Sequence, residues 1–442
     1  MPSARKVVRP VKYDVMDRKV FQCVLIVSFT GFLFGFDSVL ISGVNLPIKR
    51  LWQTSDWFHG IFIISISLWG TVVGALLGGF PTDKLGRRRA LVLVGALFIS
   101  SAVGTGLAVS PYMFSCFRFI GGLAAGIGSI AAPTYISEMS SAAHRGKLGM
   151  LFQLNIVTGI LLAFLSNYAL TGIGSIYTDW RWMISVMGLV ALVYTLLVMT
   201  INESPRWLSQ KRDDKINLTV GPYRNNRQKP PTDAGLFSGK YTKALRLSFL
   251  ISFFNQFSGI SLILFYAPEI LEKAGYGTSQ SLLSSVAIGL VNLVSTLVGI
   301  YFIDRIGRKP LMYVGSAGYL VSLSMIAYSF YVGLPADFTL VFILLFIVSH
   351  AIGQGAVIWI FIAEIFPTKV RAFGQAWGSG LLNGFAAVIT LFGAVFINAF
   401  APWLIFAFFA GLMLLQLLFT AFIMPETKGV SLEDLETKLV SS

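Results

Sequence analysis

The first residue in this sequence that could do chemistry is a lone acid, Asp37, in the stretch GFLFGFDSVLISG. The stretch lies in an apolar run that begins near Val20 and could cross a bilayer, which needs about 20 apolar residues. An ionised carboxylate at the centre of such a helix costs about 2.5–3.5 kcal/mol on insertion scales, so it usually has a partner or a function. Away from the ends of the other apolar runs, the only basic residue is Arg118, in SCFRFIGGLAAG. We therefore predict that Asp37 pairs with Arg118.

An Asp37–Arg118 pair could serve two purposes. If the acid pairs with Arg118 in one conformation and is buried away from it in another, its proton affinity changes, which is what coupling a proton to a conformational cycle requires. Alternatively, the pair is structural and never titrates. Enzyme chemistry has little support, because His59, His144 and His350 are scattered without ligand spacing. We predict no metal site, no cofactor and no enzymatic activity.

The elements that must position these residues follow from composition. Of the 442 residues, 55% are hydrophobic and 12% are charged, and the mean hydropathy is +0.75. A water-soluble chain of this size needs a polar surface that this composition does not supply, so we predict an all-α integral membrane protein. The twelve expected transmembrane spans are 20–45, 57–80, 90–109, 112–136, 146–170, 182–201, 245–271, 282–303, 310–331, 338–363, 372–398 and 402–423.

The distribution of basic residues predicts the orientation of these spans. Of the 34 lysines and arginines, 29 lie in the two tails, in the central segment or in the loops after spans 2, 4, 8 and 10. All these segments share one side of the membrane, and the positive-inside rule makes that side cytoplasmic. The net charge of +14 is thus a topology signal and not a nucleic-acid footprint. We predict a multi-pass protein of the plasma (inner) membrane, in contact with the lipid bilayer, with both termini cytoplasmic; a monomer is compatible with the sequence.

Short charged motifs recur at nearly one interval along the chain. DKLGRR returns as DRIGRK after 221 residues, EMSSAAHR as EIFPTKVR after 226, and the glutamate of NESPRW as that of PETKG after 223. Three pairs at one offset indicate two six-helix pseudo-symmetric halves, an architecture typical of transporters with a substrate site between the halves. The predicted domains are a cytoplasmic tail (1–19), an N-terminal half (20–201), a cytoplasmic linker (202–244), a C-terminal half (245–424) and a second tail (425–442).

These motifs carry a specific resemblance to a known family. The two D-x-x-G-R-[RK] motifs resemble those of the major facilitator superfamily. PTYISEM, NESPRWL, FFNQFSG, FYAPEI, IFIAEIFPTKVR and PETKG together resemble its sugar porter family, over about Phe29 to Glu433. The resemblance implies the major facilitator fold and transport of a monosaccharide, a hexose or a pentose, by alternating access. The family includes bacterial proton-coupled symporters for xylose, galactose or arabinose, and the facilitative glucose carriers of animals.

Within this family the residue at position 37 separates two mechanisms. Proton-coupled members have an aspartate in GFLFGYD, where facilitative carriers have a neutral residue, and here the motif is GFLFGFD. The resemblance thus implies secondary active transport by proton symport, with Asp37 and Arg118 at the coupling site. A facilitative uniporter with a structural Asp37–Arg118 pair is the nearest alternative. A membrane sugar sensor is a further one, although sensors of this fold usually carry long cytoplasmic tails.

A sugar presents hydroxyls around a ring with apolar faces, so its site needs amides and an aromatic surface. The resemblance places these residues at Phe34, Gln153, Asn255, Gln256, Ser261, Asn292, Trp359 and Asn383. Three of them depart from the family pattern: Asn255 replaces a glutamine, Ser261 replaces an asparagine, and Asn383 stands where many members have tryptophan. GQGAVIW also lacks the prolines of the family's GPGPIPW, so that span is expected to bend differently. Each amide could instead serve helix packing.

The repeated charges are expected at the cytoplasmic ends of the spans. Gly86 and Gly307 allow the tight turns inside the two D-x-x-G-R motifs. The resemblance implies that the charges form a cytoplasmic gate, a salt-bridge network across the two halves when the inner side is shut; alternatively, they only anchor loops in the headgroup region. The gate residues are Asp83, Arg87, Arg88, Glu138, Arg145, Glu203, Asp304, Arg308, Glu364, Arg371 and Glu426.

The central linker departs from the family pattern. In the family, NESPRWL opens a domain of several cytoplasmic helices, but here the second half begins soon after it, and TVGPYRNNRQKPPTDAG has no helical periodicity. We therefore expect a shortened linker. If the missing helices latch the inner gate, the protein cycles with a weakened latch or does not transport.

Overall fold

The computed structural model describes residues 18–140, 145–172, 179–209, 211, 236–237, 239–367 and 370–430. Over these residues, 12 helical segments are long and apolar enough to cross a membrane. Their bounds lie within a few residues of the predicted spans, except that the first extends to Trp52. The prediction of a helical membrane protein with twelve spans is confirmed.

The first six spans, which we call the N-half, contain one composite span. In span 2 a short helix, α2 (Asp56–Phe58), runs into a π-helical segment, η1 (His59–Ile64), and then into α3 (Ile66–Leu77), which α4 (Gly79–Leu85) follows. The remaining helices are α1 (Arg18–Trp52), α5 (Arg87–Gly106), α6 (Pro111–Met139), α7 (Arg145–Leu170) and α8 (Asp179–Thr200).

The last six spans, the C-half, contain two interrupted spans. Span 7 consists of α10 (Thr242–Gln256) and α11 (Ile260–Lys273), and span 10 consists of α14 (Ala336–His350), the π-helical η3 (Ala351–Gly355) and α15 (Ala356–Ile365). The other helices are α12 (Thr278–Ile306), α13 (Arg308–Val332), α16 (Arg371–Ala399) and α17 (Pro402–Phe422).

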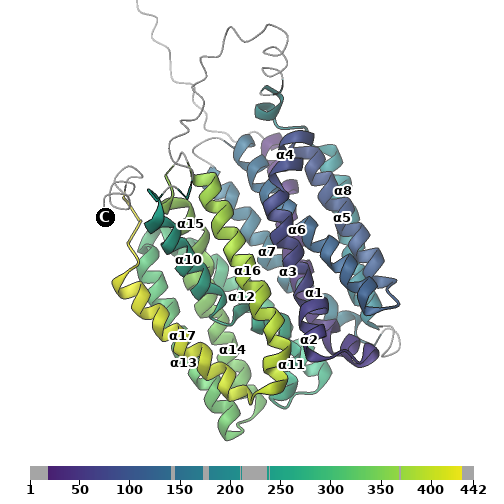
Figure 1. Ribbon diagram of the computed structural model, residues 1–442, viewed down its shortest axis with the longest axis vertical. Coiled ribbons are helices and arrows are strands. Elements are labelled where there is room, and N and C mark those ends of the chain that lie inside the picture. The colour runs from purple at the N-terminus through teal and green to yellow at the C-terminus, as the bar shows by residue number, and fades with distance from the viewer. Residues whose placement is uncertain are drawn as a thin grey trace, which may run out of the picture.

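Figure 1 shows the helices side by side, with most of the N-half (purple to blue) on the right and most of the C-half (green to yellow) on the left. α4 lies at the upper end of the bundle and α2 at the lower end, and we call these the α4 end and the α2 end. The halves contact each other through α1 with α11, through α16 with α2, η1 and α3, and through α7 with α12. Trp57 of α2 and Phe392 of α16 meet edge to face with ring centroids 5.7 Å apart, so the halves are joined at the α2 end.

Glycines spaced four residues apart bring α3 against α6. An ideal Cβ on Gly122 would lie 1.9 Å from the backbone oxygen of Ser67, and one on Gly126 would lie 2.3 Å from that of Thr71. Only glycine permits such an approach of two backbones, which is the small-residue packing common between membrane helices. The contact places Ser67 beside the helix that carries Arg118.

Span 7 is interrupted directly after Gln256. Gly259 has φ 90° and ψ 10°, a left-handed conformation that glycine adopts without a steric penalty. Further along, Tyr266 (φ −118°, ψ 15°) departs from helical geometry two residues before Pro268, whose ring does not fit a regular helix interior. Discontinuous helices of this kind form the substrate sites of many transporters. The interruption therefore fixes the positions of the amides that the sequence analysis assigned to span 7.

Candidate functional site

Asp37 of α1 and Arg118 of α6 form a buried ion pair. Nη1 of Arg118 lies 2.6 Å from Oδ1 of Asp37, and Nη2 donates to the backbone oxygen of Asp37 at 3.4 Å. Ser67 of α3 donates to the other carboxylate oxygen, Oδ2, at 3.2 Å. Asp37 is 4% exposed and Arg118 is 1% exposed. The acid is thus held by two side chains from two other helices.

The chemistry of this pair follows from its burial. Removing one partner of a buried ion pair leaves an uncompensated charge and costs about 3–5 kcal/mol. Nε of Arg118 is buried and has no hydrogen-bond partner among the described residues, so the guanidinium keeps a free donor. A displacement of Arg118 would therefore leave a buried carboxylate without its charged partner.

Ser67 did not emerge from the sequence analysis. Ser67, the second serine in ISISLWG, looks like any small residue of a membrane helix. The signal that could have found it is its spacing to Gly70 and Gly74, because residues three and seven positions apart share one helix face. That face is the one that packs against α6 and Arg118.

Three of the expected sugar-binding residues meet at the interruption of span 7. Nε2 of Gln256 donates to Oδ1 of Asn255 at 3.1 Å, and Oγ of Ser261 donates to Oε1 of Gln256 at 2.6 Å. All three residues are more than nine-tenths buried. An amide nitrogen carries two donors, so Gln256 keeps one for a ligand hydroxyl. Ser261, although shorter than the asparagine usual in the family, orients the Gln256 amide.

The other expected sugar-binding residues lie on five other helices. Asn292 on α12 and Asn383 on α16 are 5% and 8% exposed, and Nδ2 of Asn383 donates to a backbone oxygen of its own helix. Gln153 lies on α7, which packs against α12. Trp359 on α15 is 38% exposed, and Phe34 on α1 is half-buried. That these residues act together as one sugar site stays a prediction.

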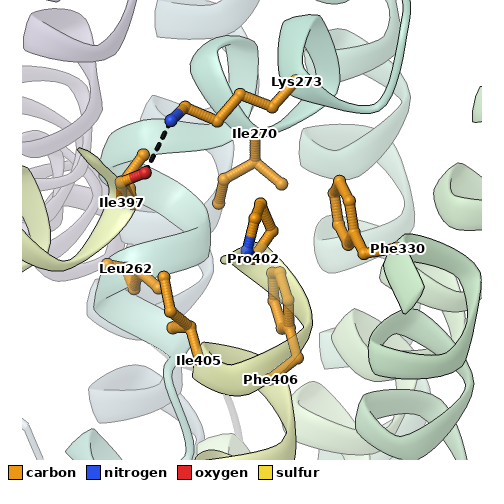
Figure 2. Close-up of a pocket in the computed structure, with 8 residues that line it drawn as sticks. All are labelled: Leu262, Ile270, Lys273, Phe330, Ile397, Pro402, Ile405 and Phe406. Carbon is orange, nitrogen blue, oxygen red and sulfur yellow. Dashed lines mark hydrogen bonds between the residues drawn. The ribbon is translucent and has the colours of Figure 1, made fainter. Parts of the chain in front are cut away.

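A cavity lies elsewhere, between α11, α13, α16 and α17 near the α2 end (Figure 2). Its walls are apolar apart from Lys273, whose Nζ donates to the backbone oxygen of Ile397 at 2.5 Å. None of the expected sugar-binding residues lines this cavity. A sugar needs several polar groups to orient its hydroxyls, so the cavity does not fit one.

The repeated charged motifs form equivalent clusters at the α4 end of each half. In the N-half, Nη2 of Arg87 lies 2.9 Å from Oε1 of Glu138; in the C-half, Nη2 of Arg308 lies 2.7 Å from Oε1 of Glu364. Asp83 adds a contact to Arg87 at 3.1 Å. These ion pairs join neighbours within one half, whereas the network expected across the halves belongs to a state in which this side is shut. That network stays a prediction.

Glu203 and Glu426 cap the helices that follow the two glycine turns. The carboxylate of Glu203 accepts the backbone N–H of Arg88 at 3.0 and 3.2 Å. The carboxylate of Glu426 accepts those of Arg308 and Lys309 at 3.1 and 2.9 Å. An acid at a helix N-terminus satisfies free backbone donors and complements the helix dipole. Both caps therefore stabilise the α4 end of their own half.

Some of the predicted features lie outside the described residues. The side chains of Arg145, Asp304 and Arg371 belong to this group, as do positions 210, 212–235 and 238 of the predicted linker. The gating role of these three residues and the shortened linker stay predictions.

Two pseudo-symmetric six-helix halves, a buried acid–base pair in one half and a polar interruption of a helix in the other define a secondary transporter of the major facilitator class. A model of the family "Sugar (and other) transporter" matches residues 23–439. The chain belongs to this sugar transporter family.

Known proteins similar to this chain support that assignment. The arabinose-proton symporter of Bacillus subtilis is 32% identical over 427 residues, which cover 92% of each chain. The galactose-proton symporter of Escherichia coli is 30% identical over an alignment of 472 positions, which covers 100% of this chain and 97% of the relative. The inward-open conformation of the xylose transporter from E. coli matches with a TM-score of 0.81 and 28% identity, over 95% of this chain and 99% of that one.

Proposed function

We propose that the chain carries a monosaccharide together with a proton across the plasma (inner) membrane by alternating access. The observation that carries this proposal is the buried pair of Asp37 and Arg118. The two side chains are 2.6 Å apart and come from two different helices of the N-half. A shift between these helices can therefore change the proton affinity of the acid. The names of the arabinose-proton and galactose-proton symporters add support, because these relatives match nearly the whole chain.

We place the α4 end in the cytoplasm. The basic residues concentrate in the tails and loops on that side, as the positive-inside rule requires. The halves meet at the α2 end, so that end is closed toward the outside. The structure then corresponds to a state that faces the cytoplasm, and the match to an inward-open relative supports this orientation.

The sugar is proposed to bind between the halves beside the interruption of span 7. Gln256 and Asn292 offer amide groups to the hydroxyls, and the half-exposed Trp359 offers an aromatic surface to the ring. The relatives named above include a symporter for a pentose, arabinose, and one for a hexose, galactose, so the proposed substrate class spans both. One chain supplies both halves of the site, and we propose that it acts as a monomer.

The test of symport is transport into reconstituted vesicles, with a panel of labelled monosaccharides and with or without an imposed proton gradient. The native protein should accumulate one of the sugars when the gradient is present. Asp37→Asn should retain exchange or equilibration only. Asp337→Asn, which removes an exposed acid outside the pair, is the matched control and should accumulate sugar like the native protein.

A facilitative uniporter is the second candidate, favoured by one observation. The Asp37 carboxylate is satisfied by both Arg118 and Ser67, as a purely structural pair would be. Uptake that only equilibrates and ignores the gradient in the native protein would establish this alternative. If no sugar moves, sugar binding is measured next, because the shortened linker could block cycling in a protein whose binding site is intact.

A further inference from the structure

At the α2 end, side chains from the two halves form a continuous chain of hydrogen bonds. Nδ2 of Asn45, on α1, donates to Oε2 of Glu269, on α11, at 2.8 Å. Oδ1 of Asn45 lies 2.6 Å from Nε2 of His59, on η1, and Nδ1 of His59 lies 2.8 Å from Oγ1 of Thr54. Asn45, His59 and Glu269 are 2%, 1% and 6% exposed. Three buried polar groups thus meet where the halves touch.

Asn45 determines which groups donate and which accept in this series of hydrogen bonds. The oxygen of its amide only accepts, so Nε2 of His59 must be the donor in that bond. With its oxygen held by His59, the amide turns its NH2 group toward Glu269. His59 is therefore a positioning residue: the hydrogen bonds of its ring go to Thr54 and Asn45 of the N-half, and through the second it orients the amide that reaches Glu269.

The two lysines near Glu269 are engaged elsewhere. Lys49 and Lys273 act on Glu269 electrostatically. Nζ of Lys49, however, lies 2.5 Å from Oδ1 of Asp56, and Nζ of Lys273 donates to the backbone oxygen of Ile397 (Figure 2). The described contact of Glu269 across the interface is thus the neutral amide of Asn45. A bond between a carboxylate and an amide is stronger than one between neutral groups, and breaking it inside a buried interface is costly.

Glu269 also lies directly beyond a kink in α11. It follows the non-helical Tyr266 by three residues and Pro268 by one. A proline inside a helix removes a backbone hydrogen bond and kinks the helix, so α11 has an inner and an outer part. The bond to Asn45 therefore ties the outer part of α11 to the N-half.

We propose that Asn45, oriented by His59, is the residue through which Glu269 fastens the two halves at the α2 end, and that this end opens only when the Asn45–Glu269 bond breaks. The proposal needs the halves to separate at this end during transport. It depends neither on the identity of the sugar nor on proton coupling.

The test exchanges the amide and the carboxylate. Asn45→Asp places two carboxylates face to face, whereas Asn45→Asp with Glu269→Gln restores an amide–carboxylate bond in the opposite direction at unchanged net charge. Distances are measured by double electron–electron resonance on the full chain in detergent, without sugar, after replacement of both native cysteines by serine. One label pair, at Leu51 and Phe400, spans the halves, and a control pair, at Leu51 and Val109, lies within the N-half.

For Asn45→Asp we expect the ratio of long to short Leu51–Phe400 distances to rise about tenfold or more. The double variant should return to the native distribution, and the control pair should not change in any variant. The proposal is overturned if Asn45→Asp keeps the native distances, or if the double variant stays as open as the single one.

A second pair of variants covers the case in which Asn45→Asp does not fold. His59→Gln keeps an N–H donor for Asn45, whereas His59→Leu removes it. We expect native distances in the first and a shift toward longer distances in the second. Equal distributions in the two variants would contradict a positioning role for His59. Because no sugar or gradient is present, these outcomes are independent of the transport assay.

Discussion

An ideal Cβ on Gly86 would stand 2.4 Å from Oε2 of Glu203, so a side chain at position 86 would displace the capping carboxylate. Gly86 also has φ 99°, in the left-handed region that favours glycine. In the C-half, Gly307 has φ 107°, and its Cβ would stand 2.9 Å from Oε2 of Glu426. The duplication has thus preserved the geometry of a capped turn together with its sequence.

Gly86→Ala should destabilise the protein. The substitution forces a residue with a side chain into a positive φ and pushes the Glu203 carboxylate away from its donors, at a combined cost of about 1–3 kcal/mol. The measurement is the thermal unfolding midpoint in detergent. Gly79→Ala is the control, because a Cβ there meets nothing within 4 Å. Equal midpoints for the two variants would refute the capped-turn interpretation.

The stability of the C-half should depend on pH through Glu426. Burial alone would raise the pKa of its carboxyl from the ordinary 4.5, but four backbone N–H groups outweigh burial and lower it. The donors belong to Arg308, Lys309, Thr427 and Lys428. A lowered pKa means that the stabilisation is complete above the pKa of the unfolded chain and is lost as the pH falls through the pKa of the folded protein.

The corresponding measurement is the unfolding midpoint of the native protein and of Glu426→Gln between about pH 3 and pH 7. The variant should unfold at a lower temperature near neutral pH. The difference between the two proteins should shrink toward acid pH, where the native carboxyl is protonated. A difference that stays constant over the whole range would show that ionised Glu426 does not supply the stabilisation.

Gln256→Ala should weaken sugar binding. The variant removes a donor and leaves Ser261 without its acceptor, so we expect KM for the transported sugar to rise about tenfold, since a lost hydrogen bond of about 1.4 kcal/mol gives that factor. Ser261→Ala should have a smaller effect, because it only releases the orientation of the amide. Gln416→Ala is the control: this buried amide donates to Ser316, so its loss should lower stability and leave KM unchanged.

Gly60→Val should hold the α2 end open. A Cβ on Gly60 would lie 2.2 Å from the backbone oxygen of Leu391 in the opposite half, and a backbone atom cannot move aside as a side chain can. The halves must therefore separate there. The Leu51–Phe400 label distance should lengthen, while Gly411→Val, at a position with nothing within 4 Å of an added Cβ, should leave it unchanged. A native distance in Gly60→Val would mean that the interface adapts locally.

The spans and the Asp37–Arg118 contact could be predicted because charged residues are rare in the membrane-spanning parts of the sequence. In an apolar span a charge is rare, so an acid and a base that both lie well inside such spans have few other partners. The twelve spans are likewise set by the length that a bilayer requires. Both inferences use composition along the chain and need no knowledge of how the helices pack.

The remaining features depend on packing and could not be predicted in this way. Ser67 reaches Asp37 only because Gly122 lets two backbones touch. Asn45 and His59 lie near the ends of spans, where polar residues ordinarily face headgroups or water, so their burial between the halves has no signature in the sequence. The same holds for the π-helical segments, which place His59 and interrupt span 10.

The two helix caps at the α4 end also bear on how the protein is made. Each cap joins the start of the third span of a half to a residue that follows its sixth span. A ribosome therefore supplies Glu203 before any span of the second half exists, and the first half can complete its own cap in the membrane while synthesis continues. The second half must wait until all twelve spans have been made, because Glu426 follows the last of them. The second half should accordingly be more vulnerable than the first to cellular quality control during biogenesis.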